Sequence, residues 1–294
     1  MHFAKGLLLH NEHAGSQKAP VIDQVLHVLK ETVSHVDHKV LTQPGEGEKI
    51  CANLDAGYDV VIIYGGDGTI HECINGIARL ESQPVIAVLP GGTCNDFSRA
   101  IGVPEELDAA CRLLKTGVIH EVDIGVMNDR FFMNFWGIGM ITETSENIDE
   151  NKKSMLGKIS YYLSALETVR NPSFFHYMIE ADGMKLEGEA AMIAALNGNY
   201  IGTLNLPFKA DHKDGYIDLV IVKDSGFPLV KEVIQTEKIK ETGKHAANLE
   251  HYKVKSFTVH TVHPMKIDMD GEVYAVTPAV CGVKKGHISF IGAT

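Results

Sequence analysis

A glycine-rich segment directly after an apolar run is the part of the chain best suited to chemistry. The run at residues 60–64 precedes Gly65, Gly66, Asp67, Gly68 and Thr69. An apolar, β-branched run predicts a strand buried on both faces. Glycines let a ligand approach the backbone, and N–H groups beside a helix N-terminus favour phosphate. Asp67 suits such a site if a divalent cation separates it from phosphate. A strand-to-helix turn capped by Asp or Thr is the alternative.

A second glycine loop follows another apolar run, at residues 85–89, and contains Gly91, Gly92, Thr93, Asn95 and Asp96. Two such loops favour a nucleoside triphosphate, which needs several N–H donors, hydroxyl groups and a cation. The chain contains no GxxxxGK[ST] motif, so it is not a Walker-type NTPase. Neither loop reads GxGxxG, which weakens a dinucleotide-binding interpretation.

The glycine loops lie within an alternation of apolar runs and helical patterns that continues to residue 114. This alternation predicts a doubly wound parallel sheet, whose ligands bind beyond the carboxyl ends of the strands. We expect strands near residues 6–9, 38–41, 60–64 and 85–89. Helices are expected at 21–33, at 48–54 and from about Thr69.

From about residue 118 the pattern changes to short strands separated by Gly, Asp and Pro turns, which predicts an antiparallel β-sandwich or barrel. We expect an α/β nucleotide-binding domain at 1–125 and a β-sandwich domain at 126–294, with the last residues able to return to the first. The expected strands are 121–126, 130–136, 174–180, 189–196, 217–222, 254–262, 265–269 and 273–276. Helices are expected at 155–168 and 228–240.

Composition narrows the class of protein. The 294 residues carry a formal net charge of -11, which argues against a nucleic-acid binder. Five cysteines, none in a CxxC pair, favour reduced thiols and a cytoplasmic protein. We expect neither a membrane-spanning helix nor a signal peptide. The histidines are interpreted as surface or packed residues rather than metal ligands.

The two glycine loops resemble the hallmark motifs of the diacylglycerol kinase catalytic family. NAD kinases share the first motif but lack the second, which reads Leu-Pro-Gly-Gly-Thr-Cys-Asn-Asp-Phe from residue 89. The loop at residues 11–15 resembles the family's first loop, with Glu12 in place of a proline. The resemblance implies ATP bound between the two domains. The implied ATP-binding residues are Asn11, Ala14, Gly15, Ser16, Thr42, Gly65, Gly66, Asp67, Gly68, Thr69, Glu72 and Thr93.

The second domain contains two further matches. Asp270, Gly271 and Glu272 resemble the family's DGE motif, in which Glu272 would be the base. A lipid alcohol is too weak an acid to attack unaided, so a nearby carboxylate should accept its proton. A β-turn with solvated acids is the alternative.

The segment 211–218 resembles the family's DGxLD motif. The resemblance implies a structural Mg²⁺ held by the Asp214 carboxylate and the carbonyls of Asp211 and Tyr216. A hairpin turn is the alternative. The resemblance also implies that Asp123 and Asp67 position a catalytic Mg²⁺.

We therefore expect an ATP-dependent lipid kinase that phosphorylates diacylglycerol or a related lipid and yields phosphatidic acid. The alternatives are an NAD kinase-like enzyme and a non-catalytic lipid-binding relative. Six lysines between residues 231 and 255 would rest against the inner face of an anionic membrane, or form a solvated surface. The family resemblance also implies a homodimer.

Overall fold

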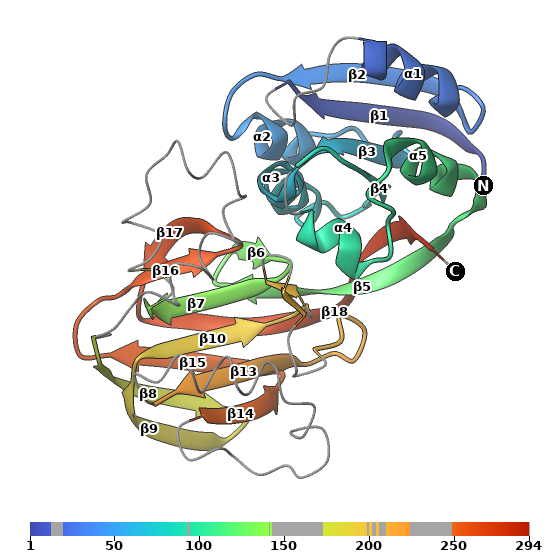
Figure 1. Ribbon diagram of the computed structural model, residues 1–294. Helices are drawn as coiled ribbons and strands as arrows, with labels where there is room; N and C mark the ends of the chain where they lie inside the picture. Colours follow the sequence, from blue (N-terminus) through green and yellow to red (C-terminus); the bar gives the residue numbers. More distant parts are fainter. Residues whose placement is uncertain are drawn as a thin grey trace. The chain divides into compact units, whose positions relative to one another are not determined.

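The computed structural model describes residues 1–12, 20–92, 95–140, 142, 173–198, 200–201, 204–205, 210–223 and 249–293 (Figure 1). The expected helices at 155–168 and 228–240 lie outside these residues. The contacts divide the chain into two compact units, Met1–Val122 with Gly286–Thr294, and Asp123–Lys285. In the described part of the chain, no helix combines the length and the apolar character needed to cross a membrane.

Unit 1 is built on parallel strands in the order β2-β1-β3-β4. They are β1 (Phe3–Asn11), β2 (Val33–Leu41), β3 (Val60–Gly65) and β4 (Val85–Pro90). Every residue of β3 is buried, as expected for a central strand with both faces covered. The C-terminal end of β18 (Ala279–Gly292) lies parallel to β4, with Phe290 opposite Ile86.

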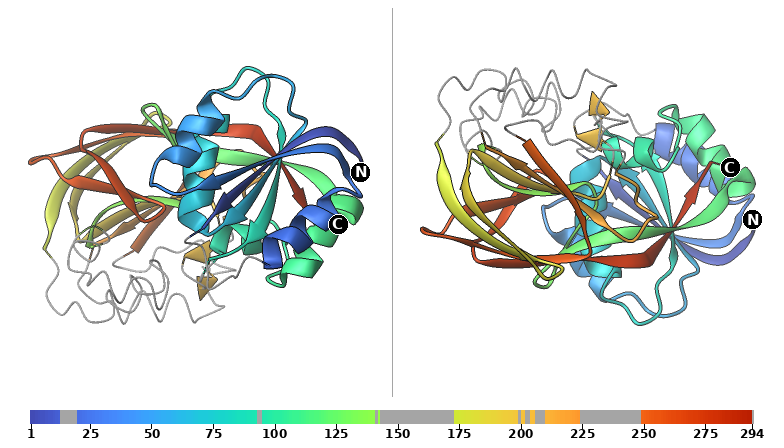
Figure 2. Two further views of the ribbon diagram at one scale, coloured as in Figure 1. Left: turned by 90° about the horizontal axis from the view of Figure 1, so that it is seen from above. Right: turned by 90° about the horizontal axis from the view of Figure 1, so that it is seen from below.

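The helices of unit 1 are α1 (Pro20–Leu29), α2 (Glu46–Ala52), α3 (Asp67–Ile77), α4 (Asp96–Ala100) and α5 (Leu107–Thr116). The strand order reverses direction at β1, so right-handed crossovers place α1 on one face and α2 and α3 on the other. Helix α1 packs beside α5, and α2 beside α3 (Figure 2). The α/β architecture expected for this part of the chain is confirmed.

Unit 2 is antiparallel. Its six-stranded sheet has the order β14-β13-β10-β7-β16-β17, and β18, β15, β8 and β9 form a second layer with this order. The strands are β5 (Val118–Met127), β6 (Arg130–Phe132), β7 (Phe135–Gly139), β8 (Phe175–Ala181), β9 (Met184–Ala190), β10 (Met192–Leu196), β11 (Tyr200–Ile201), β12 (Leu204–Asn205), β13 (Ile217–Val222), β14 (Leu249–Val254), β15 (Ser256–Thr261), β16 (Lys266–Met269) and β17 (Glu272–Val276). The expected antiparallel β domain is confirmed.

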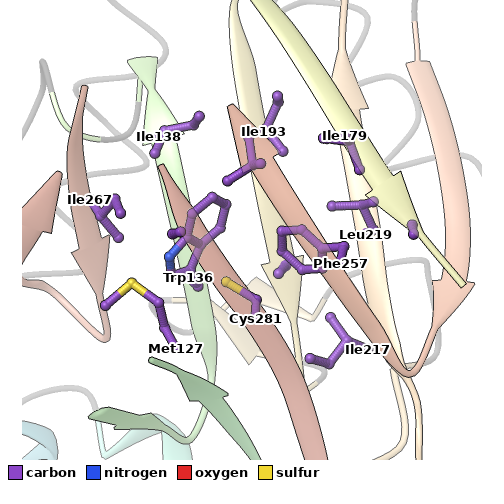
Figure 3. Close-up of a cluster of buried hydrophobic side chains, with 14 of the residues drawn as sticks. Met127, Trp136, Ile138, Ile179, Ile193, Ile217, Leu219, Phe257, Ile267 and Cys281 are labelled. Atoms are coloured by element: carbon purple, nitrogen blue, oxygen red, sulfur yellow. The ribbon is translucent and has the colours of Figure 1, made fainter. Parts of the chain in front are cut away.

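The core of unit 2 lies between its two sheets (Figure 3). Trp136 of β7 and Phe257 of β15 meet edge to face, with ring centroids 5.5 Å apart. Alternate residues of β13, Ile217, Leu219 and Ile221, also belong to this core. Complete burial of such side chains stabilises the fold by about 1.5–3 kcal/mol each. Asp218 and Val220 therefore point to the opposite face of the sheet.

Several expected boundaries were wrong. Val33 starts β2 instead of ending a helix, because Phe3 donates its N–H to the carbonyl of Thr32 and pairs with Val33. Helix α3 starts at Asp67 rather than Thr69. The expected strands 130–136, 189–196 and 254–262 are each two strands, β6 and β7, β9 and β10, and β14 and β15. Strand periodicity alone does not mark where a chain leaves one sheet for another.

Candidate active site

The carboxyl ends of β1, β2, β3 and β4 meet at one edge of the parallel sheet. Asn11 ends β1 and donates from Nδ2 to Thr69 Oγ1 at 2.8 Å. Gly91, after β4, donates its N–H to the carbonyl of Gly65 at 2.9 Å. Three strand ends therefore converge on the start of α3, where a doubly wound sheet places its ligand.

The two glycine turns touch each other. A Cβ built on Gly92 would lie 2.6 Å from Gly66 Cα and 2.9 Å from Asn95 Oδ1. Asn95, in a left-handed conformation with φ 50°, accepts the Gly92 N–H and donates to the Gly92 carbonyl, each at 2.9 Å. The backbones can approach this closely only where no side chain intervenes. The arrangement requires glycine at residue 92 and fixes one turn against the other.

Asp67 occupies the first turn of α3 and is half-buried. Its Oδ1 accepts the N–H of Phe97 at 3.2 Å, which links it to the second glycine loop. The helix N-terminus carries a partial positive charge that stabilises the carboxylate. Gly68, the next residue, is exposed, and a Cβ built on it meets no atom within 4 Å. An anionic carboxylate beside open backbone can hold a hard cation near bound phosphate.

The histidine next to Asn11 does not supply positive charge to this edge. The His10 ring stacks between Tyr64 and His38, with centroids 5.3 and 6.0 Å away. Burial, reinforced by His38, lowers the pKa of His10 below its ordinary value. Burial and His38 thus favour the uncharged ring, and the groups at this edge that suit an anion are backbone N–H groups and hydroxyls.

The remaining residues expected to bind ATP differ in their placement. Thr42 donates from its N–H and its hydroxyl to Glu46 at the start of α2, at 2.7 and 3.3 Å. Glu72 of α3 accepts the N–H of Gly47 at 3.3 Å and so links α3 to α2. Ala14, Gly15, Ser16 and Thr93 lie outside the described residues.

In unit 2, the Asp-Gly-Glu turn joins β16 to β17 and is anchored by Asp270. This buried carboxylate accepts three backbone N–H groups, from Met133 at 2.7 Å, Asn134 at 2.9 Å and Phe135 at 3.0 Å. These bonds hold the short connection from β6 to β7 against the turn. Glu272 begins β17, is partly exposed and lies opposite Met269. Asp270 therefore holds the turn, and Glu272 is the more exposed of its two carboxylates.

Replacing Asp270 with asparagine should lower the free energy of unfolding of unit 2 by about 3 kcal/mol. The amide keeps one acceptor oxygen, places an NH₂ group against a backbone donor, and removes a charge that strengthens all three bonds. Urea unfolding followed by tryptophan fluorescence measures this loss, because Trp136 lies in the affected core. Glu187→Gln, on exposed β9, is the control and should change stability by less than about 0.5 kcal/mol. Overlaid Asp270→Asn and wild-type curves would contradict the anchoring role.

Asn197 connects the Asp-Gly-Glu turn to Asp123. Its Nδ2 donates to the carbonyl of Asp123 at 3.0 Å and to that of Met133 at 2.9 Å. Asp123 is buried, and its Oδ2 accepts the N–H of Gly215 at 2.6 Å. One hydrogen-bonded network at this end of the six-stranded sheet thus joins Asp123, the 211–216 turn and Asp270.

The 211–216 turn was expected to hold a structural Mg²⁺. The carbonyl of Asp211 accepts the Asp214 N–H at 3.2 Å, and Asp214 Oδ1 accepts the Tyr216 N–H at 2.9 Å. Asp214 Oδ2 accepts from the ammonium of Lys253. Both carboxylate oxygens are engaged, one by a cation of this chain, so these residues do not fit a divalent ion. Among the described residues, no three His, Cys, Asp or Glu side chains form a metal-ion group.

Three residues have contacts here that the sequence did not indicate: Asn95 was named only as part of the second glycine loop, Lys253 only among the six lysines, and Asn197 not at all. Asn95 lies in the second motif, and its left-handed conformation is of a kind that asparagine tolerates well, so a turn-based reading could have found it. Asn197 and Lys253 act on partners 74 and 39 residues away, respectively. No local pattern indicates contacts of that range.

An α/β unit with two paired glycine turns and an antiparallel β unit with an anchored Asp-Gly-Glu turn are matched by two family models of kinase type. The family model "Diacylglycerol kinase catalytic domain" matches residues 5–127. A second, "YegS C-terminal NAD kinase beta sandwich-like domain", matches residues 138–292. The chain belongs to the diacylglycerol kinase catalytic-domain family.

Relatives resemble the chain over nearly its whole length. A protein of Staphylococcus carnosus named "Putative lipid kinase" is 31% identical and aligns over 99% of this chain and 97% of its own. A crystal structure of a "putative diacylglycerol kinase" from Bacillus anthracis has a TM-score of 0.89 at 35% identity, covering 99% of this chain and 98% of that one. Another structure of a Bacillus anthracis diacylglycerol kinase has a TM-score of 0.86 at 34% identity, covering 98% and 96%.

Proposed function

We propose that this protein transfers the γ-phosphate of ATP to the free hydroxyl of diacylglycerol and so produces phosphatidic acid. The observation that carries the proposal is the contact between the glycine turns at residues 66 and 92, which places Asp67 and exposed backbone at the start of α3. Membership of a lipid kinase family supports this reading. A lipid alcohol as acceptor also agrees with the partly exposed carboxylate of Glu272 in unit 2.

In unit 1, the exposed N–H groups near Gly68 and the hydroxyl of Thr69 are proposed to bind the phosphates of ATP. Asp67 would hold Mg²⁺, which neutralises charge on the transferred phosphoryl group when it is bound. Asp123 is buried and accepts the Gly215 N–H, so its proposed role is to fix the position of the neighbouring turn.

In unit 2, Glu272 is the proposed general base. Its carboxylate accepts the proton of the lipid hydroxyl as that oxygen forms a bond to the γ-phosphorus. The bond from the γ-phosphorus to the oxygen that bridges it to the β-phosphate breaks, and ADP leaves. Asp270 holds the turn on which Glu272 lies but, with three N–H partners, is not itself the proton acceptor.

An assay with γ-labelled ATP tests the proposal. The purified full-length protein is offered diacylglycerol in mixed micelles, a sphingoid base in the same micelles, or NAD. We expect labelled phosphatidic acid from the first and at least about 10²-fold less product from the others. Label appearing in NADP instead would establish an NAD kinase. Bound nucleotide with no transfer to any acceptor would establish a non-catalytic lipid-binding relative.

A diacylglycerol substrate requires contact with a membrane surface, and we propose that the protein acts there from the cytoplasm, as a homodimer. Of the six lysines, Lys253 and Lys255 are described and the other four lie outside the described residues. Sedimentation with anionic and neutral vesicles tests the contact, since basic residues favour the anionic ones. Light scattering tests the dimer, and a monomer mass would reject it.

Gly68→Ala should separate nucleotide binding from folding. The added methyl group meets no protein atom within 4 Å, and alanine favours a helix, so the melting temperature should stay level or rise slightly. If phosphate approaches this backbone closely, the methyl group occupies its space and the Kd for ATP should rise about 10-fold or more. Calorimetric titration measures the Kd. An unchanged Kd would place the phosphates elsewhere.

A further inference from the structure

A lysine of unit 2 pairs with an acid of the 211–216 turn. Lys253 Nζ contacts Asp214 Oδ2 at 2.5 Å. Lys253 also lies directly opposite Asp218 in the pairing of β14 with β13. The side chain of Asp214 is 24% exposed and that of Lys253 43% exposed, so the contact is partly shielded from solvent.

Asp218 is the second acid that needs a positive charge. Its side chain is buried, its Oδ1 contacts His251 Nε2, and among the described residues its Oδ2 has no hydrogen-bond partner. A buried carboxylate without a compensating charge is strongly destabilising. His251 can supply that charge only when protonated, whereas Lys253 carries it at every physiological pH.

Asp211 is the third acid near this lysine. Partial burial by itself lowers the pKa of Lys253, but the hydrogen bond to Asp214 and the charges of Asp218, Asp214 and Asp211 outweigh it and raise the pKa. The ammonium group is therefore permanently charged. An isolated surface ion pair contributes little to stability. Here the Lys253 ammonium faces three carboxylates, one of them buried. Its removal concentrates negative charge at the turn, although the Lys285 side chain packs against Gly215 nearby.

We propose that Lys253 is the resident counter-ion of this acidic turn, so that the turn is stable without a divalent cation, and that removing the lysine creates a Mg²⁺-dependent site. The ligands of that site would be the Asp214 and Asp218 carboxylates, since oxygen donors of this kind bind Mg²⁺. The inference does not depend on the proposed phosphoryl transfer.

Thermal unfolding of the full chain, in EDTA and in millimolar Mg²⁺ without nucleotide, tests the proposal. Wild-type Tm should differ by less than about 1 °C between the two conditions, because a cation that does not bind the folded state does not stabilise it. Lys253→Met should lower Tm in EDTA by about 4 °C, and Mg²⁺ should restore most of that loss. Lys253→Arg keeps the charge and should remain insensitive to Mg²⁺.

Lys185→Met is the matched control, because Lys185 forms an exposed pair with Glu180 on the same unit, at 3.4 Å. It should change neither Tm nor its response to Mg²⁺. If Lys253→Met does not fold, the double variant Lys253→Met with Asp214→Asn serves instead. Removing the paired acid should recover folding in EDTA.

Binding of Mn²⁺, followed by electron paramagnetic resonance, provides a second readout. Lys253→Met should bind one more ion than the wild type, and the double variant should lose that ion. Two results would overturn the proposal. One is a wild-type Tm that rises with Mg²⁺ and stops rising in Asp214→Asn; the other is a Lys253→Met protein that behaves like Lys185→Met in both assays.

Discussion

Glu272→Gln should lower kcat for lipid phosphorylation by about 10³-fold and leave ATP affinity within a factor of about two. Glutamine matches glutamate in size and can form the same backbone pairing at the start of β17, but its amide cannot accept the proton of the lipid hydroxyl. Because the turn is anchored by Asp270, the substitution should not displace residue 272. The loss would thus report the proton transfer alone.

Glu187→Gln is a control for this variant, since Glu187 is exposed on β9 of the same unit. It should retain wild-type kcat. A Glu272→Gln protein with wild-type turnover would remove Glu272 from the mechanism.

The elements predicted best from the sequence are those in which most consecutive residues are buried and apolar. Strand β13 begins and ends at the expected residues 217 and 222, and β3 differs by one residue, because β3 is an unbroken apolar run and Asp218 alone interrupts the apolar run of β13. Strand β18 was not predicted. Its 14 residues contain Lys284, Lys285, Gly286 and His287, a polar interruption that hides the strand in the sequence. Only its pairing with β15 and β4 reveals it as one strand.

The site residues also divide into those that a local motif indicates and those that depend on distant contacts. Asp67 and Gly92 were named from the sequence because each lies in a short glycine motif, and the structure brings their two turns together. The sequence favoured Glu272 over Asp270 as the base but could not show why. The structure shows that Asp270 is held by the backbone of residues 133–135, a contact that no local pattern encodes, while the role of Glu272 stays a prediction. The Mg²⁺ that the resemblance implied at Asp214 illustrates the reverse, because a motif supplies ligands but does not show the lysine that competes for them.

Asp67→Asn should lower kcat by about 10³-fold, which corresponds to about 4 kcal/mol of lost transition-state stabilisation. Asparagine keeps an oxygen that can accept the Phe97 N–H, so the glycine turns should stay in place. What the variant lacks is the negative charge that a hard cation requires. The effect should therefore appear as lost activity with a melting temperature within about 2 °C of the wild type.

A Mg²⁺ titration at saturating ATP and lipid separates a role at the metal from a general loss of fold. If Asp67 holds the catalytic ion, added Mg²⁺ should raise the rate of Asp67→Asn only partly, because the missing charge also positions the ion against the phosphates. Asp55→Asn, at an exposed position of the same unit, should follow the wild-type curve. Full recovery of the rate at high Mg²⁺ would show that Asp67 contributes only to the affinity for Mg²⁺. If Asp67→Asn has the wild-type kcat at every Mg²⁺ concentration, the Asp67 carboxylate is not needed for catalysis. The first motif would then contribute only the contact between the glycine turns.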